Sequence, residues 1–364
     1  MGRRTNPGGS SARLMIAAAA CAVAAGFLAV GVGVAAAAPV SCGEIITTST
    51  KLQNDLVDCP GDGVVIGADN VTLDLNGHTI DGLGGAAPFG SDGIDNSGGY
   101  DNVVIKNGTV TQFQQGVTLV GTTGNLARNL DVTQNVSSGV VVDGFAALDS
   151  FDNQLVGNRV SSNGDAIVLI GSSANVIRAN TAMANSGRGI SLLFSSRDNS
   201  VNDNLLSGNG NQGIFLFDAA NGNHLARNVV LGNTLSGVLI ADASSNELVG
   251  NHVSQNGGEG LEVEGDAPTT SDDNLLARNA VSANRLDGIF VGADTTGTVV
   301  LANDADENGD DGIDVRSPAT TITRNGADRN VELGIEAVAG VTDGGGNRAA
   351  GNGNPLQCVN VVCS

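Results

Sequence analysis

Three acidic residues near the C-terminal end of the chain recur at a spacing that would bring their carboxyl groups together. Glu259, Asp287 and Asp311 each stand directly before a glycine of a repeated sequence pattern. If each repeat adds one strand to a parallel sheet, successive members of this row lie about 4.8 Å apart. Carboxylates this close repel one another unless a cation or shared protons relieve the repulsion. The row therefore suggests a calcium site, and a row of solvated acidic side chains is the alternative.

The same region contains candidates for acid/base chemistry on sugars. Asp287, Asp311 and Asp314 supply carboxyl groups, and Arg316 follows Asp314 by two residues, which places both on one side of a strand. Paired carboxyl groups act as acid and base in glycoside hydrolysis. The arginine could bind a sugar carboxylate or simply pair with its acidic neighbours. These four residues are the candidate catalytic groups.

Other patterns for metal binding or catalysis are weaker. Asp304 to Gly309 begins like a calcium-binding loop, but its twelfth position is Val315 rather than glutamate. No nucleophilic triad or phosphate-binding loop is recognisable in the sequence. The histidines stand on different repeats, at His78, His224 and His252.

A sequence repeat between Asn180 and Ala337 must position these residues. Its pattern is Asn, four residues, Asn, three residues, Gly, an aliphatic residue, any residue, and an aliphatic residue or alanine. The pattern occurs seven times, with glycines at Gly189, Gly213, Gly237, Gly260, Gly288, Gly312 and Gly334. Short alternating apolar runs indicate strands, and a fixed period of this length indicates a solenoid. We therefore predict an all-β parallel β-helix of about twelve rungs, each with three short strands.

The repeated asparagines and glycines are predicted to be architectural. Asparagine tolerates a left-handed backbone at bends, and its amide can bond the equivalent amide of the next rung, so internal ladders are expected. The glycine before each third strand should mark a corner that needs a positive φ or a close approach of two backbones.

Positions two residues after the repeat glycines should form one row on the outer side of the third strand. In chain order the row is Asp95, Thr118, Val141, Val168, Ser191, Phe215, Leu239, Glu262, Phe290, Asp314 and Glu336. We predict that Phe215, Leu239, Glu262 and Phe290 belong to a binding face, whose length suits a polysaccharide or a cell-envelope partner. The chain has no tryptophan, which counts against tight stacking on sugars.

Three rungs contain insertions, at Asp81–Asp92, Asp143–Asp152 and Gly265–Asp273. The second and third should leave the solenoid at the same corner, just after the glycine-led strand. Loops on a rigid scaffold often carry function.

The two ends of the chain differ from the repeats. Residues 1–38 are predicted to be a signal peptide, because three arginines precede a long apolar run; an uncleaved membrane anchor is the alternative. Residues 39–62 and 353–364 are predicted to cap a β-helix of residues 63–352, and Thr50 to Leu56 are expected to form a short helical turn. The four cysteines beyond the signal should form one disulfide in each cap: Cys42 with Cys59, and Cys358 with Cys363.

The charge of the chain limits its partners. Its net charge is −21, and its only lysines are Lys51 and Lys106, so binding to nucleic acid or an anionic membrane is not expected. We predict a secreted, extracellular protein without a membrane span after signal cleavage. The sequence does not determine the oligomeric state.

From Asn70 to Ile80 the chain resembles the opening rung of secreted bacterial right-handed parallel β-helix proteins, a group that includes NosD-like domains. The resemblance covers nearly all of residues 63–352 and implies a right-handed β-helix, but one fold hosts many activities. NosD-like proteins are associated with copper, but the sequence offers no cluster of the soft ligands that a copper site needs. Met183 is the only methionine after the signal. Polygalacturonase-like hydrolases resemble the chain only at Gly309 to Gly312, so their catalytic set is not transferred.

Our interpretation is a non-catalytic protein that binds polysaccharide or a cell-envelope component. The alternative is a carbohydrate-active enzyme, a lyase, epimerase or glycoside hydrolase, that uses the acidic residues of the C-terminal rungs. Calcium is the one cofactor that the acidic row suggests.

Overall fold

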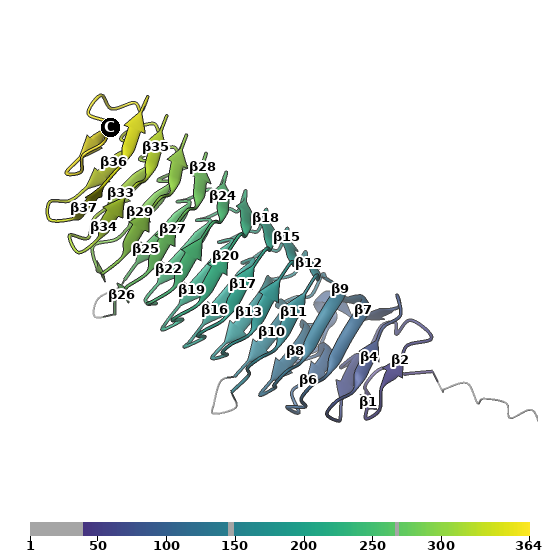
Figure 1. The fold of residues 1–364 in the computed structure, drawn as a ribbon. Coiled ribbons are helices and arrows are strands. Elements are labelled where there is room, and N and C mark those ends of the chain that lie inside the picture. The colour runs from purple at the N-terminus through teal and green to yellow at the C-terminus, as the bar shows by residue number, and fades with distance from the viewer. Residues whose placement is uncertain (1–38, 145–148, 266–268) are drawn as a thin grey trace, which may run out of the picture. The chain divides into compact units, whose positions relative to one another are not determined.

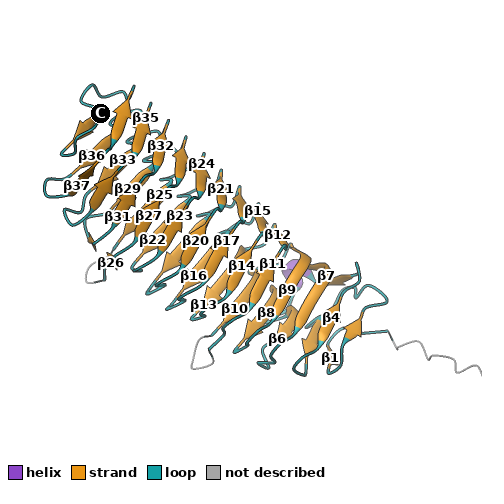
Figure 2. Ribbon diagram, viewed as in Figure 1, coloured by secondary structure: helices purple, strands orange, loops and turns teal. Residues whose placement is uncertain are grey.

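Short segments of alternating apolar and polar residues form strands throughout the described part of the chain (Figures 1 and 2). The computed structural model describes residues 39–144, 149–265 and 269–364. Each strand pairs in parallel with its counterparts one turn before and one turn after it, which produces the predicted β-solenoid. The predicted signal peptide lies outside the described residues.

One series of strands forms a 14-stranded parallel sheet, called the main sheet below. Twelve of its strands fall within the predicted range 63–352, and the first and last fall within the predicted caps. The strands are β1 (Glu44–Ile46), β3 (Val64–Ile66), β6 (Asp92–Asn96), β8 (Gln115–Val120), β10 (Ser138–Asp143), β13 (Asp165–Ile170), β16 (Ile190–Leu193), β19 (Ile214–Phe217), β22 (Val238–Ala241), β25 (Leu261–Glu264), β29 (Ile289–Val291), β33 (Ile313–Val315), β36 (Ile335–Ala337) and β39 (Cys358–Val359).

The other strands stack in two further parallel ladders, which share the long strands β7 (Val104–Thr111) and β9 (Leu126–Thr133). The first ladder also contains β2 (Thr50–Lys51), β4 (Thr72–Asp74), β11 (Gln154–Val156), β14 (Val176–Arg178), β17 (Ser200–Asn202), β20 (His224–Ala226), β23 (Glu247–Val249), β27 (Leu275–Ala277), β31 (Val299–Leu301), β34 (Thr321–Thr323) and β37 (Thr342–Gly345). The second also contains β5 (Thr79–Asp81), β12 (Arg159–Ser161), β15 (Thr181–Met183), β18 (Leu205–Ser207), β21 (Val229–Leu231), β24 (His252–Ser254), β28 (Ala280–Ser282), β32 (Asp304–Asp306), β35 (Gly326–Asp328) and β38 (Arg348–Ala350).

A few elements lie outside these three stacks. Strands β26 (Ser271–Asp272) and β30 (Thr295–Thr296) pair with each other, and Gly84–Ala86 forms the 3-10 helix η1 in the first insertion. The predicted helical turn from Thr50 to Leu56 is wrong. This segment begins with β2 and ends with a bridge from Leu56 to Ile80, because pairing with the next rung satisfies its backbone.

The core is a continuous column of aliphatic side chains inside the solenoid. On β19, Ile214 and Leu216 are fully buried in this column, and Phe215 between them points to the other side of the sheet. The alternation follows from the two-residue period of a strand. The outer side of the main sheet is therefore free to carry residues chosen for function.

Asparagine ladders join the rungs, as predicted. From Asn158 to Asn347, each Nδ2 donates to the Oδ1 of the next ladder residue at 3.0–3.2 Å. The backbone N–H of each residue donates to the same oxygen. A second ladder runs from Asn135 to Asn352 and a third from Asn153 to Asn274.

The backbone conformations at the corners differ in part from the prediction. The left-handed residue is the one before the ladder asparagine, as at Asp203 (φ 58) and Arg278 (φ 56), and the ladder asparagines themselves keep negative φ. Of the two roles predicted for the repeat glycines, close approach is the correct one. A Cβ on Gly237 would lie 2.7 Å from the carbonyl oxygen of Gly260 and 2.3 Å from Cγ1 of Val253.

Both predicted disulfides are present, Cys42–Cys59 and Cys358–Cys363. Among residues 39–144, 149–265 and 269–364, no helix has the length and apolar character to cross a membrane.

Candidate functional site

The outer side of the main sheet carries the predicted row in continuous register. Asp95 pairs with Thr118, and the pairing continues strand by strand to Asp314 and Glu336. The predicted residues therefore lie on one surface, called the outer face below. It has an apolar middle and an acidic C-terminal part, and also a polar N-terminal part that the prediction did not use.

The middle of the outer face is an aromatic and aliphatic patch. Phe215 and Leu239 are 9% and 8% exposed and form its base. The Phe217 ring stacks on Phe215 at 5.5 Å between centroids, and Phe194 meets Phe217 edge-on at 6.2 Å. Phe194 is 41% exposed, so the accessible rings are those at the edge of the patch. We call Phe194, Phe215, Phe217 and Leu239 the aromatic patch.

The guanidinium group of an arginine lies over this patch. The guanidinium carbon of Arg188 is 4.3 Å from the centroid of the Phe215 ring, a geometry that attracts the cation to the ring face. Arg188 also donates from Nε to Oε1 of Gln212 at 3.2 Å. Beside it, the hydroxyl of Ser191 is fully buried and has no hydrogen-bond partner. The patch thus combines apolar rings with polar groups.

Toward the C-terminal rungs, Glu259 and Glu262 share the hydroxyl of Ser236. Burial raises the pKa of Glu262 to about 7; the hydrogen bond from Ser236 opposes this shift, and the charge of Glu259 adds to it. Phe290 follows Glu262 in the row. These residues join the aromatic patch to the acidic rungs.

On the next two rungs, Asp287 and Asp311 are 7% and 5% exposed. Asp287 accepts the N–H of Asp311 at 2.9 Å, and Asp311 accepts the N–H of Leu333 at 2.7 Å. Burial is the main cause that raises the pKa of each carboxyl to about 7, despite these hydrogen bonds. The neighbouring carboxylates raise the pKa further.

Two groups of carboxylates could hold a cation. Oxygens of Asp287, Asp310 and Asp311 lie within 4.8 Å of one another, as do those of Asp311, Asp314 and Glu336. Asp310 thus stands with Asp287 and Asp311 where the sequence suggested Glu259. Whether calcium binds there stays a prediction.

Arg316 lies over this acidic end. It binds Asp314 at 2.9 Å, and its guanidinium carbon is 4.8 Å from the Phe290 centroid. Burial raises the pKa of Asp314, and the charge of Arg316 opposes this rise. A pocket of about 330 Å³ with a mixed lining and a polar pocket of about 250 Å³ adjoin Asp314, Arg316 and Glu336. Of the two roles suggested for Arg316, pairing with a neighbouring acid is realised in this structure.

Several residues of the outer face were missed in the sequence. Arg188 and Asp92 precede Gly189 and Gly93, the same position as Glu259, and could have been found by extending that row toward the N-terminus. Phe217 could have been found as the next outward position after Phe215. Phe194 follows the end of β16, where strand alternation gives no signal.

The remaining sequence candidates lie elsewhere. Asp304 and Asp306 are on strand β32, so the calcium-loop interpretation of this segment is wrong. His78 pairs with Asp55 at 2.9 Å, and His224 pairs with Glu247 at 3.1 Å, both on strand or corner surfaces.

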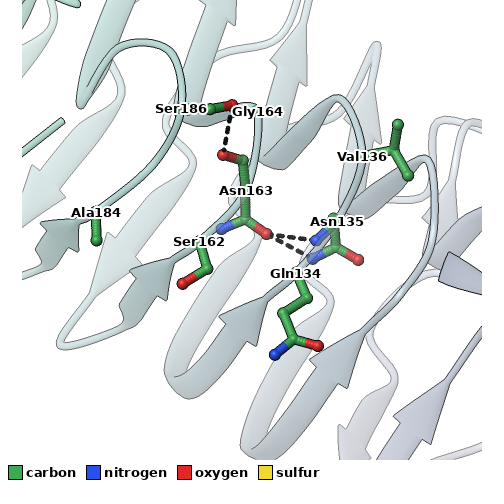
Figure 3. A pocket seen from close by; sticks show the side chains of 8 residues that line it. All are labelled: Gln134, Asn135, Val136, Ser162, Asn163, Gly164, Ala184 and Ser186. Carbon is green, nitrogen blue, oxygen red and sulfur yellow. Dashed lines mark hydrogen bonds between the residues drawn. The ribbon is translucent and has the colours of Figure 1, made fainter. Parts of the chain in front are cut away.

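A pocket of about 430 Å³ at a corner of the solenoid is shown in Figure 3. At its centre, Oδ1 of Asn163 accepts hydrogen bonds from the backbone N–H and from Nδ2 of Asn135, and the backbone carbonyl of Asn163 accepts one from the Ser186 hydroxyl. These groups therefore belong mainly to the asparagine ladder. None of its eight lining residues is titratable. We therefore place the candidate site on the outer face.

Two family models match the chain in sequence. One, described as periplasmic copper-binding protein (NosD), matches residues 94–270, and one described as right handed beta helix region matches residues 222–360. The two matches overlap at residues 222–270 and together extend over residues 94–360 of the β-solenoid. No curated protein matches it in sequence.

Solved structures share the fold. A mutant of the periplasmic alginate epimerase AlgG is 14% identical with a TM-score of 0.52, over 88% of this chain and 78% of that chain. The A-module of the Azotobacter vinelandii mannuronan C-5 epimerase AlgE6 is 13% identical with a TM-score of 0.51, over 89% of each chain. The catalytic domain of a GH87 alpha-1,3-glucanase in complex with nigerose is 12% identical with a TM-score of 0.43, over 89% and 62%. At identities this low, the two epimerase structures show the fold alone.

The described residues do not fit a copper site. Their four cysteines are in disulfides, and two of the three histidines are paired with carboxylates on separate rungs. The groups of possible metal ligands found in the described part of the chain contain only carboxylates, which prefer hard cations such as calcium.

Proposed function

We propose that the protein binds a polysaccharide outside the cytoplasm, along the outer face of its main sheet, without converting it. The disulfides and the periplasmic description of the NosD model support this compartment. Cleavage of a signal at residues 1–38 would make it a secreted protein. Two proteins of similar fold are named as epimerases of alginate and of mannuronan, which agrees with a polysaccharide ligand by analogy.

The aromatic patch carries the proposal. Phe194 and Phe217 present ring faces and edges at the border of a rigid sheet, and apolar ring surfaces pack well against the C–H faces of sugars. The Arg188 guanidinium adds N–H donors for sugar hydroxyls. A parallel stack repeats its geometry about every 4.8 Å, so the face extends beyond the patch in both directions and suits a linear polymer.

Affinity gel electrophoresis with a panel of neutral and acidic polysaccharides tests the proposal. We expect at least one polymer to retard the wild-type protein, and Phe217→Ala to lower the affinity about tenfold. The control is Leu356→Ala, since Leu356 is 70% exposed in the C-terminal cap and should have no effect. Equal retardation of the two variants by the polymer would show that the aromatic patch does not take part in binding.

A second candidate function is a carbohydrate-active enzyme, and the raised pKa values of Glu262, Asp287 and Asp311 favour it. A carboxyl group that keeps its proton near neutral pH can act as a general acid. A lyase would generate an unsaturated product that absorbs in the ultraviolet, and a hydrolase would release reducing ends.

Incubation of the retained polysaccharide with the protein separates the two functions. A binding protein leaves the polymer unchanged over many hours. Product formation that is abolished by Asp287→Asn or Asp311→Asn would establish the enzyme instead.

A further inference from the structure

The N-terminal end of the outer face contains a pocket that the proposed function does not use. It has a volume of about 340 Å³ and lies between β6 and β13, beside the first insertion. Its polar wall includes Asp92, Gln115, Thr118 and Ser138, and its apolar wall includes Val141 and Val168. A volume at the low end of small-molecule sites suits a single sugar ring.

The polar wall is organised before any ligand arrives. The Thr118 hydroxyl donates to Oε1 of Gln115 at 2.9 Å, and the backbone N–H of Asp92 donates to Oδ1 of Asp62 at 2.9 Å. Asp92 is 9% exposed, and burial raises the pKa of its carboxyl to about 7; a hydrogen bond with Thr118 opposes the rise, and the charges of Asp95 and Asp62 add to it. Near neutral pH this carboxyl can therefore donate to a sugar hydroxyl or accept from one.

A fully exposed aromatic residue directly precedes a residue that lines the pocket. Phe89 is 100% exposed and precedes Gly90, which lines the pocket. The N–H of Ser91 donates to the carbonyl of Pro88 at 3.1 Å, and Gly90 has a φ of +80°. These are the features of a type II turn with Phe89 at its second position.

The turn that carries Phe89 is anchored to the scaffold. Nε2 of Gln114 donates to the carbonyl of Ala87 at 3.3 Å, and the N–H of Gln114 donates to the carbonyl of Ser91 at 3.1 Å. An exposed apolar ring on an anchored turn gains free energy when a ligand covers it, and little conformational freedom of the turn is lost on binding. A sugar ring in the pocket would supply such a contact.

We infer that this pocket and Phe89 form a subsite for one uncharged sugar unit, with Asp92 and Gln115 bonding its hydroxyl groups and Phe89 packing against its ring. The inference rests on the proposed function, because it names the chemical class of one unit of the ligand. Among the described residues that line the pocket there is no lysine, arginine or histidine, and the carboxyl groups of Asp92 and Asp143 would repel a uronate when they are ionised.

The test uses saturation-transfer difference NMR on the full chain with methyl glycosides of glucose, galactose, mannose and N-acetylglucosamine, and with methyl glucuronide. We expect at least one neutral glycoside to bind, and the glucuronide to bind more weakly. Phe89→Ala should weaken binding about tenfold, and Asp92→Asn should weaken it as well. Asp273→Asn, an exposed site with a left-handed backbone that asparagine tolerates, is the matched control.

The outcomes separate this inference from the proposed function. Polysaccharide retention that depends on Phe217, together with glycoside binding unaffected by Phe89→Ala and Asp92→Asn, overturns the subsite and leaves the proposed function standing. Absence of any neutral glycoside binding in the wild type also overturns the subsite. Glycoside binding that both substitutions weaken, in a protein that retains no polymer, supports the pocket and rejects the polysaccharide function. Phe89→Ala is decisive if Asp92→Asn fails to fold, because the exposed ring contributes nothing to the core.

Discussion

The outer face carries several carboxyl groups that are kept partly protonated near neutral pH. Asp92, Glu262, Asp287 and Asp311 are buried against the sheet, and burial is the first cause of a pKa near 7 in each. Their ordinary values are 3.8 for aspartate and 4.5 for glutamate. The folded state therefore binds more protons than the unfolded state between these values and pH 7.

We predict that the protein loses stability as pH rises through this interval. The free energy of unfolding falls with pH wherever the folded state holds the extra protons, so the melting temperature should be higher at pH 5 than at pH 8. Asp287→Asn should shrink this difference and raise the melting temperature at pH 8, because the amide keeps the acceptor for the N–H of Asp311 without the charge. An Asp287→Asn variant with the full wild-type pH dependence contradicts the account, and Asp273→Asn serves as the control.

The acidic rungs of the outer face are expected to bind calcium. We propose that a calcium ion relieves the repulsion among Asp287, Asp310 and Asp311, whose carboxylate oxygens lie within 4.8 Å. Calorimetry at pH 8 should show calcium binding that Asp287→Ala/Asp311→Ala abolishes. No heat of binding in the wild type would identify the row as acidic surface without a metal.

The asparagine ladder links each rung of the solenoid to its neighbours. Asn228 accepts two hydrogen bonds from Asn204 and donates two to Asn251. All three residues are at most 2% exposed, so water cannot replace a lost partner.

We predict that Asn228→Ala lowers the free energy of unfolding by about 3 kcal/mol, because it leaves buried donors and acceptors unpaired. Asn211→Ala is the matched control, since Asn211 is half-buried and stands outside the ladders. Equal denaturation midpoints for the two variants in urea would show that the ladder does not stabilise the fold.

The strict repeat explains how much of the fold could be predicted. The position of the glycine in each repeat determines which of the following residues point inward and which point outward. The row from Asp95 to Glu336 could therefore be predicted from the sequence. The segment from Thr50 to Leu56 has no such repeat, and its local sequence pattern favoured a helical turn. In the structure, pairing with the next rung determines its conformation instead. Phe194 stands at a corner, where only the three-dimensional path of the chain brings its ring to Phe217.

Along the whole described solenoid, the outer face combines three surfaces of different chemistry on strands that pair in continuous register. A polar pocket around Asp92 lies at one end, the aromatic patch in the middle, and the carboxylates with Arg316 at the other end. Rigid stacking keeps these surfaces at fixed separations, which is what recognition of a repetitive polymer requires. The acidic balance of the chain favours neutral over anionic polymers at the two ends.

Hydroxyl-radical footprinting of the protein with and without a retained polysaccharide tests whether the polymer binds on the aromatic patch, because oxidation of phenylalanine and leucine side chains depends on their exposure. We predict that the polymer protects Phe194 and Phe217 from oxidation and leaves the oxidation of Leu356 in the C-terminal cap unchanged. Retention of the polymer with undiminished oxidation of Phe194 and Phe217 would contradict it.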